Sequence, residues 1–398
     1  MKSRAYIEAS DHWSLLAAAA CKQSASTSLS SLQKAGYETF ESTGFPDTRH
    51  EEWKYTNLQE IISSTFDLEK SQIKMKCEEH SGIATRALSE DNQFNIPRIC
   101  DIKRHPLAAL NTAFMDGVFL GVEPNVKNSS PINVEVSCET LRKQNQTSYQ
   151  PRLFIDIGDN SEASIVIGDH IKEDQWSNSV IEIAIGNSSH LELVFQQSGP
   201  GLATSMIAIR QESDSTLRSF VCTSEGRLIR NDLEVALSGE GSTCFMRGLF
   251  GASGNATSTH HTWVEHLVPR CKSDEIYKGV VSDNAQGSFR GKVTVRPDAQ
   301  ETEASQSNPN LILDDGAEIN TKPQLEIQAD NVKCAHGSTI GQLDENALFF
   351  LRSRGFEESV AKRLLLQGFA SSVFEFLSIP ELRENLAEKV IAEFGPSV

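Results

Sequence analysis

The chain has 398 residues, and 54 acidic side chains against 37 basic ones give it a formal net charge of −17 at pH 7. Because affinity for nucleic-acid phosphates rests on clustered Lys and Arg, this balance argues against a nucleic-acid partner. No stretch reaches the roughly 18 to 20 apolar residues of a membrane span, so we expect no membrane partner and a cytoplasmic location. The length exceeds the roughly 250 to 300 residues of a single core, which predicts two or three structural units.

The eight cysteines never lie closer than 22 residues, the separation of Cys222 and Cys244, and they form no C-x-x-C pair. This spacing fits neither a zinc site nor a ferredoxin-type cluster. Since disulfide frameworks are typical of much shorter secreted chains, we expect reduced thiols.

The hydrophobic period changes twice along the chain. Apolar residues recur every three to four positions at first, then at every second position, and finally at helical spacing again. In the first part this pattern predicts helices over residues 11–22, 29–44 and 105–115. We expect an N-terminal helical region at 1–116, a β core at 117–340 and a C-terminal helical region at 341–398.

Turn-forming clusters interrupt the strand pattern at nearly regular intervals in the β core. They begin at Gly158, Gly186, Glu212 and Gly239, so successive starts differ by 28, 26 and 27 residues. A repeat of this length, whose single unit cannot bury its own apolar face, is typical of a stacked β-solenoid. Two packed sheets joined by hairpins, as in a sandwich or jelly roll, would give a similar pattern and are the alternative.

Helical spacing returns after Leu343. Asp344 is placed to cap a first helix that ends at Gly355, a second helix is predicted over residues 357–377, and Pro380 suits the start of a third. These helices either cover an end of the solenoid or form a docking face for a partner.

The common enzyme signatures are absent or incomplete. The nearest approach to a phosphate-binding loop, Gly287-Ser-Phe-Arg-Gly291-Lys292-Val293, has three residues between its glycines instead of four and Val in place of Ser or Thr. We therefore expect no ATP site in this chain.

The segment His260-His-Thr-Trp-Val-Glu265-His266 is a first cluster of residues with useful chemistry. On a strand, positions 261, 263 and 265 share one face, whereas 260 and 266 point to the other. This division favours stacked or hydrogen-bonded histidines over a metal site.

A second cluster is Lys333-Cys334-Ala-His336-Gly. Cys334 and His336 project from the same side if the segment is extended. A thiol and an imidazole so placed could bind iron or support one another's ionisation.

A third pattern is a group of carboxylates in a turn. Asp314 and Asp315 with Glu318 could act as acid and base, or hold a metal, in a carbohydrate-active β-helix enzyme. Because similar acidic turns recur along the chain, solvation of the turn is the simpler interpretation.

Two longer segments carry a more specific signal than any short motif. They are Phe45-Pro-Asp-Thr-Arg-His-Glu-Glu-Trp-Lys-Tyr-Thr-Asn-Leu58 and the stretch from about residue 259 to 375. Both are similar to the SufB/SufD family, scaffold subunits of the SUF iron–sulfur cluster assembly system. The resemblance implies a mainly β fold, a right-handed parallel β-helix (solenoid) flanked by N- and C-terminal α-helical regions.

The resemblance also implies partners. Members of the family pair with a paralogue, SufB, through their β-helices and bind the ATPase SufC through the C-terminal helices, here about residues 344–377. The residues implied at the SufC interface are Leu348, Phe350, Leu351, Arg352, Leu364, Leu365, Phe369 and Phe374.

Two positions separate the branches of the family. A SufB chain would carry a Cys just before the strand at 308–313, where this chain has only Asn and Pro, and a Glu-rich segment in place of Cys334-Ala-His336-Gly. The chain therefore resembles the SufD branch. In that branch the His of the C-x-H-G segment is the important residue at the SufB interface, which points to His336 with Cys334 as its neighbour.

The implied function is that of a non-catalytic scaffold that contributes to iron acquisition or cluster formation at the SufB interface, while ATPase activity resides in SufC. Cys334 and His336 are the candidate ligands of a transient iron ion or iron–sulfur cluster, and His336 could instead act as an acid or base. A purely structural scaffold, with all chemistry in SufB, is the alternative. Whether a flavin binds the assembled complex stays open.

Overall fold

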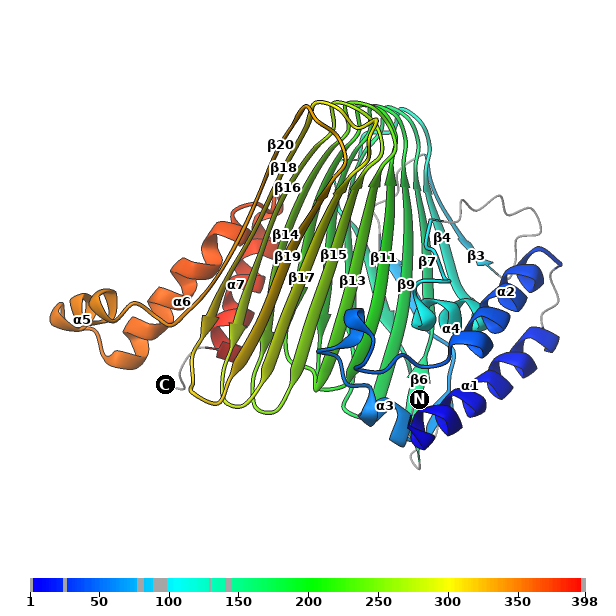
Figure 1. Cartoon of the computed structure of the whole chain (residues 1–398), viewed down its shortest axis with the longest axis horizontal. Helices are drawn as coiled ribbons and strands as arrows, with labels where there is room; N and C mark the ends of the chain where they lie inside the picture. Colours follow the sequence, from blue (N-terminus) through cyan, green and yellow to red (C-terminus); the bar gives the residue numbers. More distant parts are fainter. Residues whose placement is uncertain are drawn as a thin grey trace.

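The computed structural model describes residues 3–23, 27–76, 82–88, 99–128, 130–139 and 145–394. Strands dominate this part of the chain, and they stack into a parallel solenoid with helices at both ends of the sequence (Figure 1). The predicted mainly β fold is therefore confirmed. The sandwich or jelly-roll alternative is wrong, because the strands of the repeat pair in parallel instead of as antiparallel hairpins.

The chain passes alternately through two sheets, so that each coil of the solenoid contributes one strand to each sheet. Trp176 pairs with Leu202, and Leu202 with Leu228, which is 26 residues per coil in each step. The eleven-stranded sheet contains β1 (Phe66–Leu68), β3 (Ile83–Ala87), β4 (Asp116–Val122), β6 (Gln146–Tyr149), β7 (Pro151–Ile157), β9 (Gln175–Ile185), β11 (Leu202–Gln211), β13 (Leu228–Leu237), β15 (Thr257–His266), β17 (Gln286–Val295) and β19 (Glu318–Ile327).

The nine-stranded sheet lies opposite and is built in the same way. Its members are β2 (Gln72–Lys76), β5 (Ile132–Ser137), β8 (Glu162–His170), β10 (His190–Ser198), β12 (Thr216–Thr223), β14 (Thr243–Ala252), β16 (Lys272–Val281), β18 (Thr302–Ile312) and β20 (Val332–Gly341). Alternate side chains of both sheets point inward and form one apolar core between them.

The turn clusters that revealed the repeat are held by two devices. A residue in the left-handed region reverses the chain, at Asn160 (φ 59°), Ser188 (φ 55°) and Asp214 (φ 55°). Side-chain oxygens then link each turn to the next: Asp159 Oδ1 accepts from the backbone N–H of Asn187 at 2.7 Å. The small polar residues of these turns therefore stack the coils in register.

The N-terminal region covers the outer face of the eleven-stranded sheet (Figure 1). Trp13 packs edge-on against Trp176 of the sheet, with ring centroids 5.3 Å apart. The helices of the N-terminal region are α1 (Arg4–Gln23), α2 (Thr27–Thr43), the short 3₁₀ helix Glu51–Trp53, α3 (Gln59–Ser63) and α4 (Pro106–Phe114).

This region was expected to be helical, and the structure adds three strands to it. Strand β2 pairs antiparallel with β5, and β3 pairs antiparallel with β4, so both sheets are extended at the N-terminal end of the solenoid. Strand β1 joins β6 in parallel. Their short and partly exposed sequences lack the regular alternation that identified the core strands.

The C-terminal helices are α5 (Glu345–Ser353), α6 (Glu358–Phe374) and α7 (Pro380–Phe394). Asp344 caps α5 as predicted, since its Oδ1 accepts from the backbone N–H of Asn346 at 2.8 Å. Gly355 follows with a φ of 95°, where a side chain would be strained. Helix α6 packs on the outer face of the nine-stranded sheet, whereas α5 extends away from the solenoid (Figure 1).

Among the described helices, none is long and apolar enough to cross a membrane.

Candidate functional site

The C-terminal end of the solenoid presents two strands that have a neighbour on one side only. Within the described residues, β19 pairs with β17 and β20 pairs with β18, and neither has a second neighbour. Ile327 and Ile340 on these strands are 43% and 47% exposed, although they are in register with the buried Val295 and Asn310. The inner face of the last coil is therefore open to solvent.

Cys334 and His336 both lie on β20, so the predicted extended conformation of this segment is confirmed. Cys334 is paired with Ala304, and His336 with Gln306, on the face that points into the solenoid. Cys334 is half-buried, and burial raises the pKa of its thiol despite an opposing hydrogen bond from the backbone of Ala304. His336 is exposed at the open end.

Two polar residues lie directly behind His336 in the interior. Glu275 on β16, Gln306 on β18 and His336 on β20 occupy the same position in three successive coils. Gln306 Nε2 donates to Glu275 Oε2 at 2.6 Å, and both side chains are almost completely buried. Burial raises the pKa of Glu275 to about 7.

Sequence reasoning missed Glu275 and Gln306. A signal for them exists: aligning the coils from the known positions of their strands places 275, 306 and 336 in one inward-facing column. Nearer the N-terminus the same column carries Ile132, Ile165, Leu193, Ser219 and Met246, so a single polar residue precedes the two consecutive ones.

The histidine-rich segment on β15 is divided between the two faces as predicted. His260 and His266 are buried inside the solenoid, where the His260 ring stacks on Phe250 with centroids 4.9 Å apart. His260 Nε2 is 2.8 Å from Thr223 Oγ1, and His266 Nε2 is 2.9 Å from Ser273 Oγ. Burial lowers the pKa of His260 to about 3 and that of His266 to about 4, so both rings are neutral packing elements.

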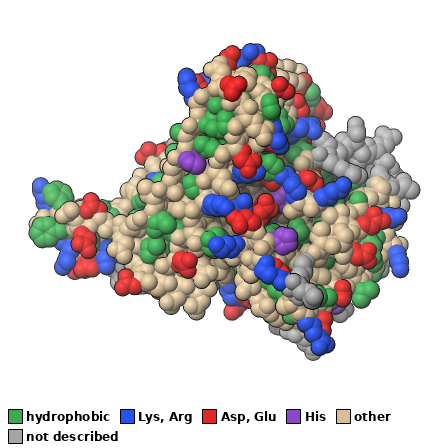
Figure 2. All heavy atoms as spheres, in the orientation of Figure 1, with side chains coloured by type: hydrophobic (Ala, Val, Ile, Leu, Met, Phe, Trp, Pro, Cys, Tyr) green, Lys and Arg blue, Asp and Glu red, His purple; other side chains and the backbone are tan. Residues whose placement is uncertain are grey.

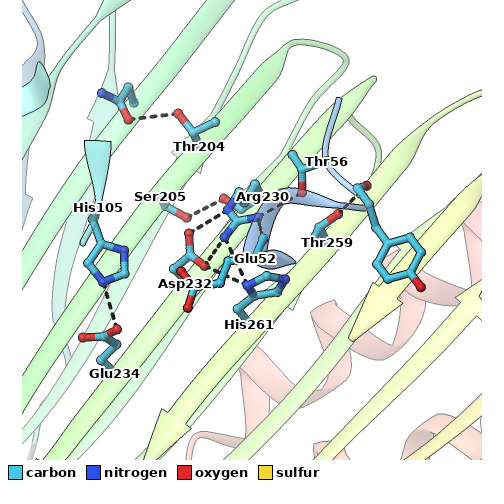
Figure 3. Close-up of polar contacts among 12 residues, drawn as sticks. Glu52, Thr56, His105, Thr204, Ser205, Arg230, Asp232, Glu234, Thr259 and His261 are labelled. Atoms are coloured by element: carbon cyan, nitrogen blue, oxygen red, sulfur yellow. Dashed lines mark hydrogen bonds and ion pairs between the residues drawn. The ribbon is translucent and has the colours of Figure 1, made fainter. Parts of the chain in front are cut away.

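The outer face of β13 holds the N-terminal region on the solenoid (Figure 3). Arg230 on β13 makes two hydrogen bonds of 2.8 Å to Asp232, and it also donates to the backbone oxygen of Glu52 at 2.8 Å. The same guanidinium lies 3.6 Å from the centre of the Trp53 ring. The segment from Phe45 to Leu58 therefore has a structural role.

His261 completes this cluster as a neutral acceptor. Arg230 Nη2 lies 3.1 Å from His261 Nδ1, as Figure 3 shows. Burial, together with the charge of Arg230, lowers the pKa of His261 well below its usual value. In the described part of the chain, no three His, Cys, Asp or Glu side chains come together as a group that could hold a metal ion.

The two remaining sequence patterns are explained by the fold. The glycine-containing segment 287–293 lies within strand β17 instead of in a loop before a helix, and a Cβ at Gly291 would lie 2.0 Å from Gln306 Nε2. Asp314 accepts from the backbone N–H of Asp283 in the adjacent turn at 2.8 Å. Asp314 therefore links two successive coils.

The apolar residues of the C-terminal helices fall into two groups. Phe374 is buried against Phe220 of the nine-stranded sheet, and Phe369 is half-buried beside Lys278. Leu348, Leu351 and Leu365 are also half-buried. The exposed group consists of Phe349, Phe350, Arg352, Phe356 and Leu364, of which sequence reasoning missed Phe349 and Phe356.

Comparison with known proteins now adds to this geometry. The family model described as "SUF system FeS cluster assembly, SufBD core domain" matches residues 140–369, more than half of the chain, and the model of the SufBD N-terminal region matches residues 13–84. The chain belongs to the SufBD family. The core match contains β16, β18 and β20, and the N-terminal match contains the segment that docks on Arg230.

Two individual proteins of this kind are similar over most of their length, and a third is similar over about half of its own. The iron–sulfur cluster assembly protein SufD of Escherichia coli is 26% identical over 89% of both chains. A SufBD family protein of Synechocystis is 28% identical over 87% of this chain and 86% of its own. A chloroplastic protein of Arabidopsis thaliana, ABCI7, is 30% identical over 60% of this chain and 52% of its own.

Proposed function

We propose that this SufBD-family chain is a scaffold subunit for iron–sulfur cluster assembly that works in a complex with a SufB-type paralogue and a SufC-type ATPase. The observation that carries the proposal is the open C-terminal end of the solenoid, where His336 and Cys334 lie on an edge strand. The similarity to a SufD protein over most of both chains supports it.

The paralogue binds at the edges of β19 and β20. Unpaired strand edges offer rows of backbone donors and acceptors to another strand. The exposed Ile327 and Ile340 add apolar surface that a second solenoid would bury. Pairing of two solenoids in this way extends both sheets from one subunit into the other.

The ATPase binds at α5 and the start of α6. Phe349 and Phe350 are 74% and 56% exposed, and Phe356 and Leu364 lie on the same part of the chain. Figure 2 shows hydrophobic side chains gathered at the tip where Figure 1 places α5. Exposed aromatic side chains of this kind are the usual anchors of a protein interface.

Iron or the nascent cluster is the cargo of this interface. Cys334 and His336 supply one thiol and one imidazole, which are ligands that iron accepts, and the paralogue supplies the others. Because the thiol of Cys334 has a raised pKa in the isolated chain, a nearby metal ion or positive group must promote its ionisation. His336 is the residue that either binds iron or moves a proton there.

The assembly is tested by replacing Ile340 with Lys and measuring binding to the purified paralogue by calorimetry. A charge on the exposed inner face of the last coil should weaken binding at least about tenfold. The control is Leu15→Lys, because Leu15 is 72% exposed on α1, far from this edge. Equal affinities of Ile340→Lys and the unchanged chain would contradict pairing at β20.

A further inference from the structure

The column Glu275, Gln306, His336 runs from the buried interior to the open end of the solenoid. Parallel strands lie about 4.8 Å apart, so in-register side chains on one face are direct neighbours. Gln306 therefore touches Glu275 on one side and has His336 as its neighbour on the other.

The orientation of the Gln306 amide is fixed by its partner. Above its pKa of about 7 the Glu275 carboxylate is ionised and only accepts hydrogen bonds, so under those conditions the group that faces it is the Nε2 donor. Gly291 on the opposite sheet leaves the space for this amide, because a Cβ there would lie 2.0 Å from Nε2. The Oε1 atom is consequently directed away from Glu275.

Gln306 is only 3% exposed, and its Oε1 atom is buried. Within the described residues this oxygen has no hydrogen-bond partner. Leaving a buried acceptor unsatisfied is unfavourable, so a donor that reaches it is favoured. On β20, Cys334 and Ser338 are in register with Ala304 and Asn308. His336 is the β20 residue aligned with Gln306, and its ring carries an N–H.

We propose that Gln306 is a positioning residue for His336: Oε1 of Gln306 accepts the N–H of one ring nitrogen, and Glu275 holds the amide in the orientation that makes this possible. The other ring nitrogen then keeps its lone pair and points toward the open edge. The column thus selects one tautomer of the imidazole before any partner arrives. This inference deepens the proposed function, since it concerns the same histidine at the same interface.

The hydrogen bond is read directly from the ¹⁵N signals of the His336 ring in the full-length protein, assigned by comparison with His336→Ala. At about pH 8.5 a free imidazole is neutral and exchanges between tautomers, which averages its two nitrogen signals. The unchanged chain should instead show one N–H and one unprotonated nitrogen. Gln306→Met keeps the shape but removes the acceptor, and should shift both signals to the averaged values.

Two further variants separate positioning from packing. Glu275→Gln offers both a donor and an acceptor to Gln306, so the Gln306 amide can adopt either orientation. The two ¹⁵N signals of the His336 ring should then shift partly toward the averaged values of a free imidazole. Met246→Leu is the control, because Met246 is the neighbour of Glu275 in the same column and has no polar role. A tautomer signature in Gln306→Met like that of the unchanged chain, or an equal change in Met246→Leu, would overturn the proposal.

The same variants distinguish this inference from the proposed function. If Gln306→Met changes the ¹⁵N signals of the His336 ring and also slows cluster formation on the assembled complex, both the positioning role of Gln306 and the proposed function are supported. If the signature changes but His336→Ala assembles clusters normally, the positioning stands and the role of His336 in assembly fails.

Discussion

The two ends of the solenoid solve the problem of an exposed sheet edge in different ways. At the N-terminal end, β2 and β3 pair antiparallel with the first strands of the two sheets, and helices cover the outer face. At the C-terminal end β19 and β20 are left without a second neighbour in the described part of the chain. The strands that end the sheets at the N-terminal end, β2 and β3, also have one neighbour each but are only five residues long, whereas β19 and β20 are ten residues long. Because short edge strands offer little to another chain, we call the N-terminal end finished and the C-terminal end open.

The interior of the solenoid also differs between its two ends. The column that begins with Ile132, Ile165 and Leu193 continues with Ser219 and Met246 and ends with Glu275, Gln306 and His336. Buried polar groups cost free energy when they lack partners, so consecutive polar residues in this column reduce stability. Such a run occurs only in the last three coils of the column, next to the open end.

The largest predicted effect concerns the N-terminal region that covers the eleven-stranded sheet, where Arg230 of β13 joins this region to the solenoid. Arg230→Ala leaves Asp232 buried without its partner and removes the contact with Trp53. The free energy of unfolding should fall by about 3 to 5 kcal/mol in a denaturant titration. The matched control is Arg227→Ala, whose ion pair with Glu60 is exposed and should contribute about 0 to 1 kcal/mol.

A loss of less than 1 kcal/mol in Arg230→Ala would show that the N-terminal region is held on the solenoid by other contacts.

The second prediction concerns the polar interior. The pKa of Glu275 is raised by burial to about 7 in the folded chain, from an ordinary value near 4.5, so the folded protein holds this proton more tightly. Stability is therefore lost as pH rises from about 4.5 through about 7, by about 3 kcal/mol in all. Glu275→Gln removes this loss.

The measurement is the unfolding free energy of Glu275→Gln and of the unchanged chain at pH 5 and pH 8. The advantage of the variant should grow by about 2 to 3 kcal/mol between the two pH values, because all other titrations are shared. An advantage that does not change with pH would mean that Glu275 is not held neutral by its burial.

The third prediction contains the smallest expected effect, that of Phe349→Ser on binding, and separates the two groups of apolar residues in the C-terminal helices. Phe349→Ser should weaken ATPase binding by about 1 to 2 kcal/mol without changing the melting temperature, because this ring is 74% exposed. Phe374→Ala should instead destabilise the chain by about 3 to 5 kcal/mol, since Phe374 is buried against Phe220. Melting curves and ATPase affinities measured for both variants test these two predictions. Normal binding by Phe349→Ser would show that α5 is not part of the ATPase interface.

Much of this architecture could be predicted from the sequence, because the solenoid repeats its signals. Turn clusters such as those at Gly158 and Gly186 recur with each coil, and alternation placed His260 and His261 on opposite faces correctly. The caps of the C-terminal helices are local as well, so Asp344 and Pro380 were found.

The parts that escaped prediction depend on contacts between distant residues. Strands β2 and β3 are short, and their partners fix them more than their own pattern does. Glu275 is a buried acid only because Gln306, 31 residues later, is its neighbour in the next coil. Phe349 and Phe374 are equally apolar in sequence, and only the packing of α6 on the solenoid tells them apart.

The most direct test of the account is the rate of iron–sulfur cluster formation on the assembled complex that contains His336→Ala. The account predicts a complex of unchanged mass and stability whose cluster formation is slower by at least about tenfold, whereas His190→Ala, an exposed histidine at the start of β10, has no effect. Cluster formation at the normal rate with His336→Ala would contradict the central claim that the open end of the solenoid takes part in assembly.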